Sequence, residues 1–166
     1  MGAGTWESHH AISTLMFRYA ECVDQAKFDA LSGLFAHGSI RSTSAAESDK
    51  GMRGEEIGRF YAATNRVHPD GTLRTRHLST NVMVDIDEAA DRATARSYYV
   101  VLQATPKLPF QPIAGGRYDD RFERVDGTWR FADRLIHVDQ IGDMSEHLSF
   151  DLSKGSVEFD EVVPPG

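Results

Sequence analysis

An aspartate and a histidine are the residues of this sequence best suited to acid–base chemistry. Asp24 ends an apolar helical stretch, and His77 stands in the segment TRHLSTN, at the head of a strand whose later residues 82–86 are mostly apolar. A strand that crosses under the helix would bring the carboxylate to one ring nitrogen, which fixes the tautomer and raises the basicity of the other. The pair is therefore a candidate general base with its orienting partner.

Both residues also have a purely structural interpretation. Asp24 lies at a bend, where an aspartate readily caps the next helix, and His77 fits a core histidine bonded to a backbone carbonyl. Strict alternation divides the strand into two faces: Leu78, Thr80, Val82, Val84 and Ile86 against His77, Ser79, Asn81 and Met83. The face with His77 then lines a polar pocket or meets solvent.

Three helices are expected before residue 65. Apolar residues recur at helical spacing in three stretches: 8–22, 28–35 and 54–63. Ser8 is the expected cap of the first helix, and His37-Gly38 offers a glycine stop to the second. A short strand is expected near residues 39–44, followed by a polar loop.

Long strands dominate the remainder of the chain. The pattern predicts strands at residues 75–86, 93–105, 113–124 and 128–138, joined by hairpin-like turns. Gly115-Gly116 is typical of a bulge in a bent strand. Helices followed by antiparallel strands predict an α+β fold with the helices on one face of a curved sheet. We expect one domain over residues 1–166, with a core at about 8–140 and a tail, 141–166, that wraps the body or a neighbouring subunit.

Composition limits the possible partners and the compartment. Eighteen Lys and Arg against 25 Asp and Glu give a net charge of −7, and no basic cluster interleaved with aromatics stands out, which argues against nucleic acid. The lone Cys22 excludes an intramolecular disulfide, and no secretion signal or membrane-length apolar run is present. The sequence predicts a cytoplasmic protein with no membrane partner.

Other chemistries lack their sequence signatures. The histidines outside the pair have no metal-ligand spacing, and the chain has no zinc-type Cys/His pattern, phosphate-binding glycine loop or Gly-x-Ser-x-Gly elbow. No metal, cofactor or covalent catalysis is therefore expected. Tyr19 is either a core residue or a hydrogen-bond donor to a substrate oxygen. Most aromatic side chains are expected in the core, and four are candidates for an apolar substrate pocket: Phe60, Tyr61, Tyr99 and Tyr118.

Three segments, in order and at fitting spacings, resemble the SnoaL-like branch of the nuclear-transport-factor-like superfamily. They are FRYAECVDQAKFDALSGLFA, TRHLSTNVMVDID and IAGGRYDDRFERVDGTWRFADR. The resemblance covers roughly residues 8–140. It implies a cone-shaped α+β fold in which a curved antiparallel sheet wraps around three helices and leaves a deep pocket. It also implies a dimer or trimer formed through the outer sheet face.

The resemblance further implies roles for individual residues. In the similar scytalone dehydratase, bile acid dehydratase and lindane dehydrochlorinase, an aspartate late in the first helix and a histidine on the long strand form a catalytic dyad, which Asp24 and His77 match. Tyr19 matches a tyrosine of the bile acid dehydratase, and Arg134 matches an arginine that assists the leaving group in the dehydrochlorinase. The acid on the dehydratase's next strand aligns near Leu102, which leaves the proton donor unassigned.

These inferences predict a cofactor-independent lyase or isomerase. Its His77–Asp24 pair would remove a proton from a small hydrophobic ring compound carrying oxygen, with help from Tyr19 and Arg134. Two other functions fit the same fold. One is a non-catalytic subunit similar to the β subunits of ring-hydroxylating dioxygenases, and the other is a module that binds a hydrophobic ligand without changing it.

Overall fold

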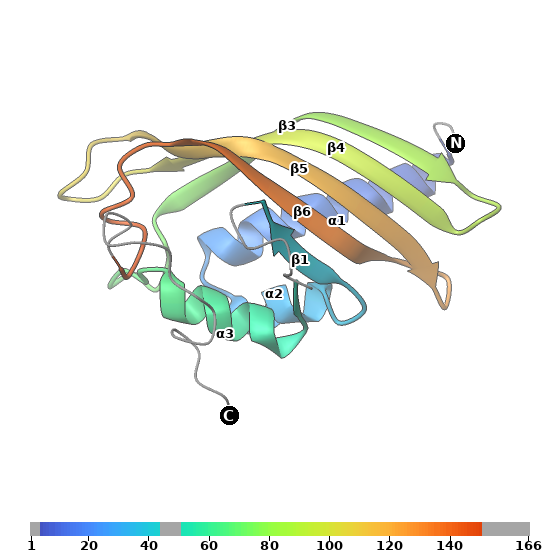
Figure 1. Cartoon of the computed structure of the whole chain (residues 1–166), viewed down its shortest axis with the longest axis horizontal. Helices are drawn as coiled ribbons and strands as arrows, with labels where there is room; N and C mark the ends of the chain where they lie inside the picture. Colours follow the sequence, from blue (N-terminus) through green and yellow to red (C-terminus); the bar gives the residue numbers. More distant parts are fainter. Residues whose placement is uncertain (1–3, 44–50, 151–166) are drawn as a thin grey trace.

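The computed structural model describes residues 4–43 and 51–150, which form three helices and six strands (Figure 1). The helices are α1 Trp6–Asp24, α2 Phe28–Leu34 and α3 Glu55–Thr64. The strands are β1 Ser39–Ser42, β2 Met52–Arg53, β3 Thr75–Asp87, β4 Arg92–Gln103, β5 Gln111–Val125 and β6 Thr128–Ile141. The expected α+β class and the order of helices and long strands are confirmed. Most of the polar loop and the end of the tail, 151–166, lie outside the described residues.

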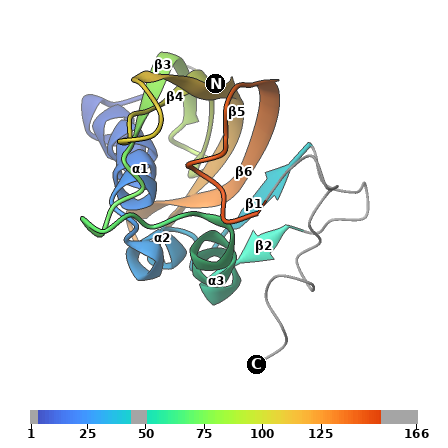
Figure 2. The same cartoon turned by 90° about the vertical axis from the view of Figure 1, so that its left-hand side faces the viewer.

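The strands form one curved, open sheet in the order β2-β1-β6-β5-β4-β3. The long strands pair antiparallel as expected, but β1 pairs parallel with β6, so the sheet is mixed. Figures 1 and 2 show the helices on its concave face, with the sheet curving around α1. The cone-like arrangement therefore matches the expectation, whereas the wholly antiparallel sheet does not.

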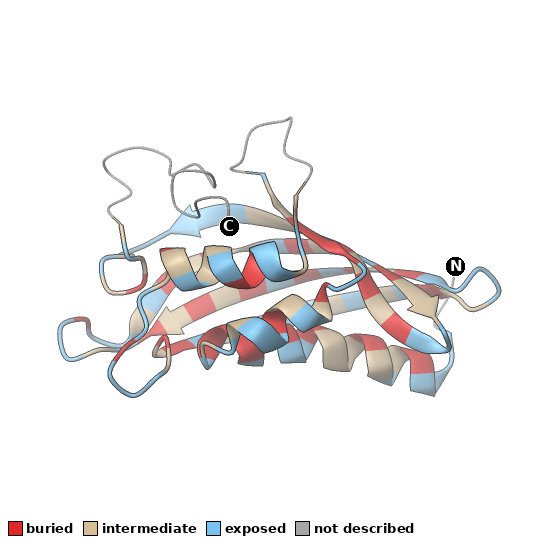
Figure 3. Ribbon diagram, turned by 90° about the horizontal axis from the view of Figure 1, so that it is seen from below, coloured by how far each residue is buried: buried red, intermediate tan, exposed pale blue. Residues whose placement is uncertain are grey.

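Helix α1 begins earlier than the apolar pattern indicated. Thr5, not Ser8, is the N-cap, and its hydroxyl accepts a hydrogen bond from the Ser8 amide at 3.1 Å. The buried side chains of Ile12, Met16 and Val23 then recur along the helix face that packs on the sheet. Figure 3 shows buried residues gathered where helices and strands meet.

A bulge in β3 overturns the strict alternation expected for that strand. The register with β4 shifts between Thr80 and Met83, and Asn81 takes a left-handed φ of 52°. The extra residue reverses the parity. As a result, His77 and Ser79 face the same side as the later apolar residues Val82, Val84 and Ile86, while Leu78 and Met83 face outward and are about half exposed.

The outward face of the sheet also carries Tyr98, which is 52% exposed. Apolar side chains on this face are compatible with the expected homo-oligomer, which stays a prediction. No helix among residues 4–43 and 51–150 is long and apolar enough to cross a membrane.

The expected bulge at Gly115-Gly116 is confirmed, because the register with β6 shifts there. A Cβ at Gly116 would lie 1.9 Å from the carbonyl oxygen of His137, whereas a Cβ at Gly33 in α2 meets no atom within 4 Å. The close approach of the two backbones therefore requires a glycine at position 116, whereas position 33 has room for a side chain.

Gly116→Ala should lower the free energy of unfolding by roughly 1–3 kcal/mol, because the strand must move away from His137. The matched substitution Gly33→Ala should raise it by up to ~1 kcal/mol, since alanine is the better helix former. Urea unfolding of both variants measures the two changes in the free energy of unfolding, which should have opposite signs. A Gly116→Ala variant as stable as the parent would contradict the packing described here.

Candidate active site

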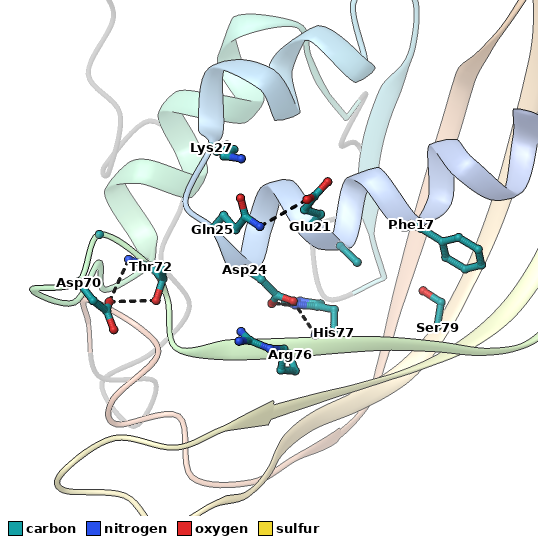
Figure 4. A pocket seen from close by; sticks show the side chains of 12 residues that line it. Phe17, Glu21, Asp24, Gln25, Lys27, Asp70, Thr72, Arg76, His77 and Ser79 are labelled. Atoms are coloured by element: carbon teal, nitrogen blue, oxygen red, sulfur yellow. Dashed lines mark hydrogen bonds and ion pairs between the residues drawn. The ribbon is translucent and has the colours of Figure 1, made fainter.

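The carboxylate of Asp24 accepts three hydrogen bonds from the start of β3. The ring Nδ1 of His77 and the hydroxyl of Thr75 both lie 2.6 Å from Oδ1, and the backbone amide of His77 lies 3.0 Å from Oδ2. Figure 4 shows the Asp24 and His77 side chains pointing toward each other across the gap between α1 and β3. The predicted convergence of carboxylate and imidazole is therefore present in the structure.

The local fold explains why the two residues meet. Asp24 is the last residue of α1, and its backbone carbonyl accepts a hydrogen bond from the Leu73 amide, which fixes the chain just before β3. Thr75 and His77, two residues apart on one strand, point to the same side. Asp24 does not cap α2, whose N-cap is Lys27 without a side-chain bond. The carboxylate thus serves β3 and not the next helix.

The charge state of the pair follows from its surroundings. Burial alone would raise the pKa of Asp24, but the hydrogen bonds from the His77 ring, the Thr75 hydroxyl and the His77 amide outweigh burial and lower that pKa below its ordinary value. An ionised carboxylate only accepts hydrogen bonds, so Nδ1 of His77 carries the proton. In the neutral form of the ring the lone pair is then on Nε2, which has no hydrogen-bond partner among the described residues.

An outward-facing cleft of about 730 Å³ runs beside the pair, between α1 and β3 (Figure 4). Asp24 and His77 form part of its wall. Their side chains are only 11% and 9% exposed, respectively. The remaining lining is mixed, from the half-exposed ring of Phe17 to the charged side chains of Glu21 and Arg76. The pair is sheltered but borders a space large enough for a small molecule.

Tyr19 and Arg134 belong to a second cluster, inside the fold. Arg134 is fully buried, binds Asp120 through two hydrogen bonds of 2.8 and 2.7 Å, and lies over the rings of Tyr19 and Tyr118. Burial would lower the pKa of Arg134, but the Asp120 carboxylate raises it, so the guanidinium stays charged. Its Nη1 is buried and has no partner among the described residues.

The predicted substrate-binding aromatics surround this second cluster and do not line the cleft. Tyr61 and Tyr19 share a hydrogen bond between their hydroxyls at 2.8 Å, and the rings of Tyr99 and Tyr118 stack at 4.4 Å. Phe60 lies on α3 beside Tyr61. Their role in substrate binding stays a prediction.

Residues 4–135 match the family of SnoaL-like domains, a part of the nuclear-transport-factor-like superfamily. The chain belongs to the SnoaL-like family. No curated protein matches the sequence. The resemblance found in the sequence is thus confirmed.

Solved structures show the same fold as this SnoaL-like domain. One is a variant of a Mycobacterium tuberculosis protein of unknown function, 24% identical, with a TM-score of 0.66 over 95% of this chain and 85% of that one. Two come from Novosphingobium aromaticivorans. A candidate scytalone dehydratase is 22% identical (TM-score 0.61; 82% of this chain, 87% of that one). The β subunit of a candidate aromatic-ring-hydroxylating dioxygenase is 18% identical (TM-score 0.61; 85% and 95%). Both an enzyme-like and a subunit-like relative therefore share this architecture.

One residue that contacts the Asp24–His77 pair was not found from the sequence. Thr75 is completely buried and bonds Asp24; its position two residues before His77 on a strand was the available signal. Within the residues that the structure describes, no group of three or more His, Cys, Asp or Glu side chains is placed to hold a metal ion.

Asp24→Asn should lower the free energy of unfolding by about 1–3 kcal/mol at neutral pH, because it weakens the bonds to β3. A carboxyl whose pKa is lowered by folding stabilises the fold above its unfolded pKa, and this contribution is lost as the pH falls through the folded value. The difference between parent and variant should therefore shrink below about pH 4.

Urea unfolding at neutral pH and at pH values below the ordinary aspartate pKa measures this difference. Asp29→Asn, which changes an exposed aspartate on α2, is the matched control and should show little effect at either pH. A gap between Asp24→Asn and the parent that is unchanged in acid would contradict the charged state assigned to Asp24.

Proposed function

We propose that this protein is a cofactor-independent lyase or isomerase that removes a proton from carbon next to a carbonyl group. The observation that carries the proposal is the 2.6 Å bond between Asp24 and Nδ1 of His77, which leaves the lone pair on Nε2 unpaired. A carboxylate behind an imidazole both orients the ring and stabilises the cation that forms when the ring accepts a proton. This arrangement fits a general base.

The proposed elimination needs only one proton carrier. Nε2 of His77 takes the proton, and the electron pair of the broken C–H bond moves toward the carbonyl oxygen to give an enolate. The enolate then expels hydroxide from the next carbon, forming the carbon–carbon double bond. The proton on Nε2 passes to the departing hydroxide, so that water leaves and His77 returns to its neutral form. This cycle provides a donor although the acid of the similar bile acid dehydratase aligns near Leu102.

Tyr19 and Arg134 are proposed to stabilise the oxygen that gains charge. Burial raises the pKa of Tyr19, so its hydroxyl stays protonated and can donate a hydrogen bond. The unpartnered Nη1 of Arg134 is a second donor in need of an acceptor. Both donors lie among the aromatic rings of the interior cluster, so a substrate that reaches them from His77 must be small and largely apolar. A small hydrophobic ring compound carrying oxygen is therefore the proposed substrate class.

The main test uses ring-bearing β-hydroxy ketones, beginning with the aldol adduct of benzaldehyde and acetone, whose dehydration yields the strongly absorbing benzalacetone. His77→Ala and Asp24→Asn should each lower the rate by roughly 10²–10⁴-fold while circular dichroism stays unchanged. Native mass spectrometry of the purified protein identifies any molecule that remains bound. Equal turnover by parent and His77→Ala would sink the proposal.

Tyr19→Phe tests the second donor cluster. If Tyr19 contacts the charged oxygen, kcat should fall by roughly 10²–10³-fold, the usual loss for one oxyanion donor. The lost bond to Tyr61 should cost only about 1 kcal/mol of stability. Tyr61→Phe removes the same internal bond and is the matched control. Equal, small effects of both variants on kcat would assign Tyr19 to the core alone.

A non-catalytic role is the alternative with an observation in its favour. All three bonds of the Asp24 carboxylate also fasten α1 to β3, and a β subunit of a candidate ring-hydroxylating dioxygenase shares the fold. Under this alternative the protein would copurify with a larger iron-containing chain. A simple hydrophobe-binding module would instead release its ligand chemically unaltered.

A further inference from the structure

The described part of the C-terminal tail, residues 142–150, turns back onto the body of the protein. Backbone hydrogen bonds join Arg66 to His147 and Ser149 to Thr64, each at 2.8 Å. Figures 1 and 2 both show this segment, which follows β6, returning to the end of α3. Of the two expected partners of the tail, the body or a neighbouring subunit, the described part contacts the body.

Side chains connect this segment to the dyad. The carbonyl oxygen of Glu146 accepts hydrogen bonds from Nε2 of His68 at 3.0 Å and from Nε2 of Gln103 at 3.1 Å. Gln103 pairs with Thr75 in the sheet and also donates to the carbonyl of Leu73, whose amide bonds Asp24. One buried glutamine therefore bridges the tail and the start of the strand that carries His77.

The ring of His147, next to Glu146, is buried and incompletely bonded. The residue is 8% exposed, and its Nδ1 is buried without a hydrogen-bond partner among the described residues. Buried polar groups in proteins are normally paired, and leaving one unpaired costs about 1–3 kcal/mol. Nδ1 of His147 therefore has a hydrogen bond still to make, which a bound ligand can supply.

The charges around His147 keep its ring neutral. Burial lowers the pKa of His147 to about 4, and the charge that His77 carries when protonated lowers it further. Asp24 opposes this shift, and His68 adds to it. On the tail itself, Glu146 is adjacent and pairs with Arg66 at 3.9 Å. A neutral neighbour is what a base at His77 requires, because a second imidazolium would repel the positive charge that His77 acquires.

We propose that His147 is a further substrate-contacting residue, which donates a hydrogen bond from its neutral ring to the substrate oxygen. This inference rests on the proposed function and deepens it by assigning a third side chain to the same site. A neutral imidazole polarises a carbonyl without giving up its proton, so His147 ends the reaction in the state in which it began. The tail then completes the site.

The first experiment tests placement and needs no substrate. Ring NMR of the whole protein should show His147 titrating near pH 4, and His77→Gln should raise that pKa because a like charge is removed. His10→Gln, on the exposed part of α1, is the control and should leave it unchanged. An identical His147 titration in the parent and His77→Gln would overturn the inference.

The second experiment tests contact with a ligand oxygen. The probe is para-nitrophenol. Its phenolate oxygen mimics the oxygen of an enolate, and its absorption reports binding. His147→Phe should weaken binding roughly tenfold, the loss expected for one hydrogen bond. Ser149→Ala removes a bond that anchors the same segment, to the carbonyl of Ala63 at 2.6 Å, but keeps the ring, and should bind like the parent.

Each result has a defined meaning. Three results overturn the contact between His147 and the ligand: the parent does not bind para-nitrophenol, His147→Phe binds it as tightly as the parent, or Ser149→Ala loses as much affinity as His147→Phe. A different outcome is that the protein shows the shifted His147 titration and the weakened binding and still dehydrates none of the β-hydroxy ketones. That outcome would uphold His147 as a ligand contact and reject the lyase chemistry. Failure of this inference is thus distinguishable from failure of the proposed function.

Discussion

The carboxylate of Asp24 holds the end of α1 against the start of β3, and the position of the catalytic candidates depends on this contact. Its three donors come from two residues, Thr75 and His77, so the strand is fixed both by its backbone and by its side chains. Hydrogen bonds to an ionised group are stronger than neutral ones. The same bonds that stabilise the fold therefore also set the tautomer and orientation of the imidazole.

The interior cluster has a different physical character. A buried ion pair such as Arg134–Asp120 gains little net stability, because desolvation opposes the attraction of the charges. Stacking on Tyr19 and Tyr118 offsets part of that cost through cation–π contacts. Under the proposed function, the unpaired nitrogen of this buried charged group would bind the substrate oxygen.

The sequence predicted the dyad but not its surroundings, for identifiable reasons. Asp24 and His77 stand at the ends of elements with strong periodicity, so their meeting followed from the expected packing of helix on sheet. The predicted alternation of faces along β3 was wrong because the bulge at Asn81 adds one residue, and a sequence pattern of alternating residues does not reveal a bulge. The parallel pairing of β1 with β6 joins strands far apart in the sequence, and His147 lies where no periodicity marks an element. Both depend on tertiary contacts.

The bulge at Asn81 resolves a conflict within β3. An unbroken strand would place the polar residues His77 and Ser79 on the opposite face from Val82 and Val84, so that either the base or the apolar run would face solvent. One extra residue turns both sets toward the helices. The strand can then bury its apolar end in the core while its first residues present His77 to Asp24. The irregularity is thus what allows a single strand to contribute to both the core and the site.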